Sequence, residues 1–182
     1  MASALDGLLV VYFVIHAVLA VVVDAQMVAG PWLYQYYAAA GVTKVVADWV
    51  KDEGDFLVGE KAPWFIALIW SELLLQVPAC CWLARKWIAK DNAARVPAIL
   101  YSCLVLASMV PIYSTLVADP RPTLVCKGVY AIWIALPLLL LLRSAASPLF
   151  PSPADAEEKR LPVPSPQFSR ARKVQSFTKK HL

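Results

Sequence analysis

The chain has 182 residues, of which 60% are apolar and 16% charged, and its formal net charge is +4. Soluble globular domains carry roughly 45–50% apolar and about 25% charged residues, so this composition excludes an ordinary soluble domain. The small net charge gives no support to nucleic-acid binding. The four cysteines lie in or beside apolar runs, without a CxxC pair or a histidine at ligand spacing. We therefore expect no metal, no cofactor and no structural disulfide.

Four long apolar runs are the main feature of the sequence. They cover residues 7–28, 63–84, 96–118 and 123–142. A helix of about 20 residues spans a hydrocarbon core of roughly 30 Å. The sequence therefore predicts an all-α, polytopic membrane protein built as a four-transmembrane-helix bundle. Prolines inside the last three runs, at Pro78, Pro111 and Pro137, predict kinks and not breaks.

The first run has a second interpretation, as a cleaved signal peptide. It begins near the N-terminus, and the small residue Ala25 lies near a plausible cleavage position. The residues before the run include Asp6 and no Lys or Arg, and the run is longer than an ordinary signal-peptide core. We therefore expect a retained helix.

The distribution of basic residues predicts the orientation. The loop between the second and third runs holds Arg85, Lys86, Lys90 and Arg95, and the segment after the fourth run is also basic. The loop between the first and second runs holds more acidic than basic residues. By the positive-inside rule, the second loop and the C-terminal segment are cytoplasmic, and four spans place the N-terminus there too. The acidic first loop then faces the lumen or the outside.

The first loop, residues 30–62, is rich in aromatic and β-branched residues and is not a bare linker. Its segment 43–52 can form an amphipathic turn or two, with apolar side chains at Val45, Val46 and Val50. Two interpretations stay open. The segment could lie in the aromatic belt at the membrane interface, or it could form a luminal cap over a cavity between the helices.

The C-terminal segment differs in composition from the rest. It is rich in proline, serine and charge, which predicts a disordered cytoplasmic tail at 145–182 after a four-helix membrane domain at 7–144. Lys179 and Lys180 occupy the fourth and third positions from the C-terminus. This position matches the dilysine signal for retrieval to the endoplasmic reticulum. The alternative is an ordinary basic tail attracted to anionic lipid.

Two acidic residues inside the apolar runs, Asp24 and Glu72, are the strongest candidates for a functional site. An acid within a membrane span costs a few kcal/mol on insertion scales (about 3), so it is usually paired or functional. Because consecutive spans are antiparallel, both acids are predicted in the same half of the membrane. Within hydrogen-bond distance they would share one proton, and the remaining charge would suit a basic amine or a sterol hydroxyl. A structural polar cluster is the alternative.

Further polar and aromatic residues could complete this site. Gln76 follows Glu72 by one helical turn, and His16 precedes Asp24 by two turns. On the third and fourth runs the candidates are Tyr101, Ser108, Tyr130 and Trp133. Taken singly, each of these four is more typical of a helix-packing or interfacial residue.

Short motifs agree in order and spacing with a known family. They are Asp24-Ala25-Gln26, Ala62-Pro63-Trp64-Phe65, Ser71-Glu72-Leu73-Leu74-Leu75-Gln76-Val77-Pro78, Pro97-Ala98-Ile99-Leu100-Tyr101-Ser102 and Val110-Pro111-Ile112-Tyr113-Ser114-Thr115. Over residues 11–144 the chain resembles the sigma-2 receptors, four-helix membrane proteins of the emopamil-binding-protein-like, or EXPERA, superfamily. Ser108 and Trp133 stand where animal members carry Thr and Tyr, and the third loop is shorter here.

The resemblance implies an endoplasmic-reticulum protein with a buried pocket that opens toward lipid and binds sterols and cationic amphiphilic molecules. It implies that Asp24 pairs with the ligand amine, that a protonated Glu72 hydrogen-bonds Asp24, and that Asp55 holds the luminal loop. By matching position, the pocket-lining residues are Gln76, Tyr101, Ser108, Tyr130 and Trp133. As partners, the resemblance implies the Niemann-Pick type C transporter and a second copy of the chain.

Two classes of function stay open. The first is a non-enzymatic receptor that binds sterols and cationic amphiphiles and regulates sterol homeostasis and transport. The second is a sterol Δ8–Δ7 isomerase, in which Asp24 and Glu72 would do acid–base work. That reaction needs a proton donor and an acceptor on opposite sides of a double bond, and the isomerase's His and Glu arrangement is not evident here. We therefore favour the receptor. A structural partner without a ligand is a third, simpler possibility.

Overall fold

The computed structural model describes residues 4–145 and 148–150, and over these residues it contains helices and no strand. Four helical segments in this part of the chain are long and apolar enough to cross a membrane: Ala4–Met27, Pro63–Ile88, Asn92–Ala118 and Leu124–Ala145. They confirm the four predicted spans and the all-α fold of a multi-pass membrane protein. Nearly all of the predicted tail, with Lys179 and Lys180, lies outside the described residues.

The first span is a regular helix that ends in a tighter turn. Helix α1 covers Ala4–Val22, and a 3-10 turn covers Asp24–Met27. In a bilayer every backbone group must be satisfied within the protein, which favours an uninterrupted helix over the whole apolar run. The tighter turn places Asp24 at the end of the span, immediately after α1.

The second span changes its helical geometry in the middle. Helix α5 covers Pro63–Ser71, a π-helical turn covers Glu72–Gln76, and α6 covers Val77–Ile88. The N–H of Val77 donates to the carbonyl of Glu72, five residues back. Pro78 follows at once and has no N–H to donate, so the regular hydrogen-bond ladder is already interrupted there. A single π turn of this kind often marks a functional site.

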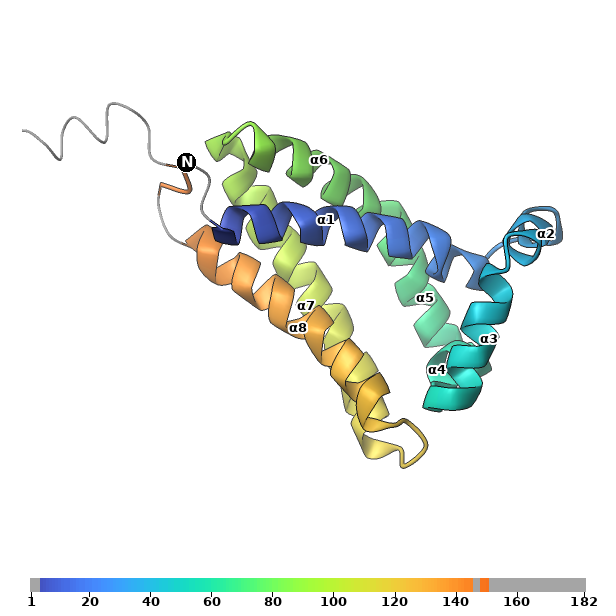
Figure 1. Cartoon of the computed structure of the whole chain (residues 1–182). Helices are drawn as coiled ribbons and strands as arrows, with labels where there is room; N and C mark the ends of the chain where they lie inside the picture. The colour runs from blue at the N-terminus through green and yellow to red at the C-terminus, as the bar shows by residue number, and fades with distance from the viewer. Residues whose placement is uncertain (1–3, 146–147, 151–182) are drawn as a thin grey trace, which may run out of the picture. The chain divides into compact units, whose positions relative to one another are not determined.

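The third and fourth spans are continuous helices. A 3-10 turn at Asn92–Ala94 leads into α7, Arg95–Ala118, and α8 covers Leu124–Ala145. Both helices continue through their internal prolines, Pro111 and Pro137, so these prolines do not break them. The two helices pack side by side along their length, as Figure 1 shows, and α1 packs along α6.

The first loop folds into three short helices, which we call the cap helices. They are α2, Pro31–Ala39, α3, Val42–Glu53, and α4, Phe56–Glu60. Helix α3 covers the segment predicted to be amphipathic, and it has a glycine at each end. Figure 1 shows the cap helices gathered beyond the end of α1.

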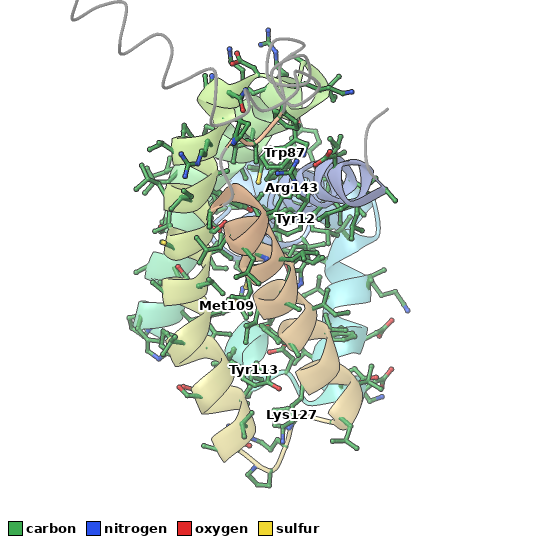
Figure 2. The ribbon with its side chains drawn as sticks, turned by 90° about the vertical axis from the view of Figure 1, so that its left-hand side faces the viewer. Tyr12, Trp87, Met109, Tyr113, Lys127 and Arg143 are labelled. Carbon is green, nitrogen blue, oxygen red and sulfur yellow. The ribbon has the colours of Figure 1, made fainter. Side chains whose placement is uncertain are left out.

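The opposite end of the bundle is filled by aromatic side chains. Phe13 is fully buried, with ring centroids 5.8 Å from Trp87 and 6.0 Å from Tyr101. In Figure 2, Trp87, Arg143 and Tyr12 lie toward this end, Lys127 lies at the other end, and Met109 and Tyr113 lie between. The Arg95 guanidinium donates to the carbonyl of Ser144 at 3.1 Å, which ties the start of α7 to the end of α8.

Candidate functional site

A cavity of about 400 Å³ lies between the membrane helices and the cap helices. Its apolar wall comes from several elements and includes Leu19, Val42, Val45, Val46, Val58, Phe65, Leu68, Ile69, Val105, Met109, Ile112 and Val129. The polar and aromatic groups that reach it are His16, Asp24, Trp49, Asp55, Glu72, Gln76, Ser108, Tyr130 and Trp133. A mostly apolar cavity with a few convergent polar groups is the usual form of a small-molecule site.

Local backbone geometry brings both predicted acids to this cavity. Asp24 stands on the 3-10 turn that follows α1, and Glu72 begins the π turn of the second span. Each acid therefore lies at a departure from regular α-helix. No other acid besides Asp55 lines the cavity among the described residues.

The hydrogen-bond partner of Glu72 is His16 and not Asp24. The distance from His16 Nε2 to Glu72 Oε1 is 2.7 Å, and no hydrogen bond joins the two acids in the part of the chain that the structure describes. The expected proton shared by Asp24 and Glu72 is therefore not part of this geometry. The reason is depth: Asp24 lies eight residues, or roughly 12 Å, further along the span than His16, and His16 is at the level of Glu72.

His16 continues into a buried chain of hydrogen bonds. Its Nδ1 lies 2.6 Å from the hydroxyl of Tyr101. That hydroxyl is 2.9 Å from the hydroxyl of Tyr12 and accepts from the thiol of Cys80 at 3.2 Å. When Glu72 is ionised, Nε2–H donates to it and Nδ1 accepts from Tyr101, so the chain sets the tautomer of His16.

Tyr101 therefore does not line the cavity. It lies behind His16, buried among α1, α6 and α7, and it is hydrogen-bonded to the imidazole that lines the cavity. The other residues predicted from the third and fourth spans, Ser108, Tyr130 and Trp133, do face the cavity. The Ser108 hydroxyl donates to the carbonyl of Leu104 at 3.0 Å, which leaves its oxygen as an acceptor.

Asp55 joins the cap helices to the bundle. The residue is 1% exposed. Its Oδ2 accepts from Trp49 Nε1 at 3.0 Å and from the hydroxyl of Tyr130 at 2.9 Å. Its Oδ1 accepts from the N–H of Val58 at 3.3 Å, which caps the N-terminus of α4. A buried carboxylate is tolerated when donors satisfy it, and here the three donors come from α3, α4 and α8.

The wall contributed by α3 was not among the site residues predicted from the sequence. Val42, Val45, Val46 and Trp49 face the cavity. Their spacing of three, four and seven residues is the signature of one helix face, and this signal is present in the sequence. The spacing alone could not distinguish a helix that lies on the membrane interface from a helix that covers a cavity, because either helix would bury this apolar face.

A comparison with family models settles the broader relationship. Residues 41–144, more than half of the chain, match the model of EXPERA (EXPanded EBP superfamily). The chain belongs to the EXPERA family. The match begins in the cap helices and ends with the last span, so it includes every cavity residue except those of the first span.

Similarity to individual proteins extends over most of this EXPERA chain. It is 28% identical to Sigma intracellular receptor 2 of Xenopus tropicalis over 178 residues, which cover 87% of this chain and 96% of the relative. The identity to Sigma intracellular receptor 2 of Homo sapiens is also 28%, over 177 residues that cover 85% and 93% of the two chains. Efficient mitochondria targeting-associated protein 19 of Saccharomyces cerevisiae is 32% identical over 76 residues, 42% of this chain and 45% of that one. The predicted family resemblance is confirmed.

Proposed function

We propose that this EXPERA chain is a membrane receptor that binds sterols and cationic amphiphilic molecules in its cavity and does not transform them. One observation carries the proposal: a mostly apolar cavity of about 400 Å³ contains the carboxyl groups of Asp24 and Glu72. Ligand sites of drug-sized molecules occupy about 300–1,000 Å³. The name of the full-length relatives, Sigma intracellular receptor 2, supports a receptor.

The apolar wall and the acids have separate roles in this proposal. Burying the ring system of a sterol or the hydrophobic part of an amphiphile supplies about 25 cal/mol per Å² of apolar area. The acids set the orientation, because a carboxylate in an apolar site attracts an ammonium group and accepts from a hydroxyl. The His16–Glu72 hydrogen bond holds one acid in place, and Asp24 remains for the ligand.

We also propose a cellular setting for this receptor. The chain lies in the endoplasmic-reticulum membrane with both termini in the cytoplasm, and it regulates sterol homeostasis and transport. Its partners are the Niemann-Pick type C transporter and a second copy of the chain. The basic second loop supports the orientation, and the resemblance to the sigma-2 receptors supports the location and the partners.

The test is equilibrium binding of a radiolabelled cationic amphiphile to the purified protein, with Asp24→Asn and Glu72→Gln as variants. A charge-assisted hydrogen bond contributes about 1.5–3 kcal/mol, so each variant should bind about 10–100-fold more weakly. Asp48→Asn is the matched control, because Asp48 is an exposed acid of α3 that pairs with Lys44 at 2.8 Å and does not line the cavity. Undiminished binding in both cavity variants would overturn the proposal.

One observation favours a second candidate, the sterol isomerase. The His16–Glu72 pair, which the sequence did not reveal, is an imidazole and a carboxylate in contact at the cavity wall. Such a pair can donate and accept protons. Incubating the purified protein with a Δ8-sterol distinguishes the two: the receptor leaves the sterol unchanged, whereas accumulation of the Δ7 isomer, absent in His16→Ala, would establish the enzyme.

A further inference from the structure

Helix α3 is packed more closely at its C-terminal end than at its N-terminal end. A glycine with positive φ flanks each end, Gly41 at +76° and Gly54 at +68°. A methyl group added at Gly54 would lie 2.3 Å from the carbonyl oxygen of Arg121, whereas one added at Gly41 would meet nothing within 4 Å. The C-terminal end of α3 is therefore packed against the α7–α8 loop, whereas at the N-terminal end there is space for a methyl group at Gly41.

The apolar face of α3 closes the cavity without being fully buried itself. Val42, Val45 and Val46 face the cavity, and Val45 remains 68% exposed. These three residues lie in the half of α3 next to Gly41. The half next to Gly54 carries Trp49, which is bonded to Asp55. Among the described residues, the hydrogen bonds from α3 side chains to other elements therefore lie in the half next to Gly54.

The packed end is held by the short loop between α7 and α8. The N–H of Thr123 donates to the carbonyl of Glu53 at 3.0 Å, and the Thr123 hydroxyl bonds the Glu53 carboxylate. These contacts join the last residue of α3 to the start of the fourth span. Because these contacts all lie at one end of the helix, they hold that end of α3 in place but leave the tilt of the helix relative to the bundle unrestrained.

Arg121 adds a second attachment, to α4. Its Nη1 donates to Glu60 Oε1 at 2.6 Å, and its guanidinium lies 4.2 Å from the ring centroid of Phe56. Its Nε and Nη2 donate to Asp119 at 2.9 and 2.8 Å. We call these four side chains the Arg121 clasp. A planar guanidinium can bond two carboxylates and stack on a ring at once, which an ammonium group cannot do.

Within the clasp, Arg121 and Asp119 stabilise each other's charged forms. Hydrogen bonds from Arg121 lower the pKa of Asp119 to about 2. Hydrogen bonds to Asp119 and Glu60 raise the pKa of Arg121. The clasp nevertheless lies at the surface, with the Arg121 side chain 51% exposed and that of Glu60 58% exposed. Exposed ion pairs are weak and screened by salt, so the clasp can open without unfolding the bundle.

We propose that Arg121 is a positioning residue that sets how fast ligand enters and leaves the cavity. It holds α4 against the bundle directly. It holds α3 indirectly, because Asp55 at the start of α4 is bonded to Trp49 of α3. When the clasp opens, α4 is released and α3 swings at its Gly41 end. This inference rests on the function proposed for the cavity. Arg121 does not line the cavity, so it should control the rates of ligand association and dissociation and not the ligand affinity.

The first experiment measures ligand exchange with the radiolabelled amphiphile. Arg121→Gln should accelerate both association and dissociation about 3–10-fold, with Kd changed by less than about twofold, because an exposed ion pair contributes only weakly to holding α4. Glu60→Gln removes the same contact from the other side and should give the same acceleration, and Arg121→Lys should restore part of the slow exchange. Lys44→Gln, which removes an exposed ion pair of α3 itself, is the control.

The second experiment needs no ligand, so it remains informative if the receptor proposal fails. Hydrogen exchange of the backbone amides at 42–49 should accelerate in Arg121→Gln and Glu60→Gln, while exchange in α7 and α8 stays as in the unaltered protein. Acceleration throughout the bundle would indicate general destabilisation and would overturn the inference. Unchanged exchange at 42–49, or an unchanged dissociation rate of a ligand that does bind, would overturn it too.

Discussion

At the end of the bundle that carries Trp87, aromatic side chains fill the space between the helices, whereas at the capped end the same helices enclose a cavity. Phe13, Tyr12, Trp87 and Tyr101 are each 3% exposed or less. At the filled end a 3-10 turn at Asn92–Ala94 only precedes α7, while at the hollow end the 3-10 turn at Asp24 and the π turn at Glu72 lie within the first and second spans. The two acids that the spans contribute to the cavity therefore both lie where the helical geometry of their span changes.

His16 lies at the boundary between these two regions. Its Nδ1 contacts Tyr101 of the filled end at 2.6 Å, and its Nε2 contacts Glu72 of the cavity at 2.7 Å. The imidazole of His16 therefore contacts the packed aromatic core on one side and the proposed ligand site on the other. Substitutions in the filled end should affect stability, and substitutions at the boundary should affect both stability and binding.

The largest effect is expected in the filled end. Phe13→Ala should lower the free energy of unfolding by about 3–5 kcal/mol, because it leaves a cavity among buried aromatic rings. Val45→Ala, at an exposed position of the cap, should change it by less than about 0.5 kcal/mol. Denaturation in detergent micelles measures both. Equal destabilisation by the two substitutions would contradict the division into a filled and a hollow end.

The next prediction compares the cost in unfolding free energy of adding a methyl group at each end of α3. Gly41→Ala should cost about 1–2 kcal/mol, the ordinary penalty of a left-handed backbone for an L-residue. Gly54→Ala should cost more, because the added methyl group would lie 2.3 Å from the Arg121 carbonyl oxygen and the backbone must shift. The measurement is the difference in unfolding free energy between the two variants. A smaller cost at Gly54 than at Gly41 would show that the α7–α8 loop does not pack there.

A smaller effect is expected at the boundary. Tyr101→Phe removes the hydroxyl that contacts His16, Tyr12 and Cys80. Leaving buried polar groups without a partner costs about 1–3 kcal/mol, and loss of the tautomer control at His16 should also weaken amphiphile binding. Tyr113→Phe is the control, because no hydrogen bond of the Tyr113 hydroxyl occurs in the part of the chain that the structure describes. Thermal denaturation and equilibrium binding are the two measurements.

The smallest effect is a pH dependence of the Arg121 clasp. Because Arg121 lowers the pKa of Asp119 from 3.8 to about 2, the ionised carboxylate contributes stability that is fully present above its ordinary pKa. This contribution is lost as the pH falls through about 2. The protection of the α3 amides, expressed relative to the intrinsic exchange rate at each pH, should therefore fall between pH 4 and pH 2, and Asp119→Asn should flatten that part of the profile. An identical profile in Asp119→Asn would exclude the clasp as its origin.

The four spans and the amphipathic character of α3 could be predicted from the amino-acid sequence alone. Both are properties of a single segment: about 20 apolar residues match the thickness of a bilayer, and Val42, Val45, Val46 and Trp49 repeat with the period of a helix. The two acids within the spans were also visible, because an ionisable residue in an apolar run needs no partner to be recognised.

Which side chains meet across the bundle could not be predicted from the sequence. The pairing of Glu72 with His16 instead of Asp24, and the place of Tyr101 behind the imidazole, depend on the depth and rotation of neighbouring helices. The π turn at Glu72–Gln76 changes that rotation within the second span. The contact of Arg121 with Glu60 joins residues 61 positions apart. Such contacts follow from how whole helices pack, and no pattern within one segment contains that information.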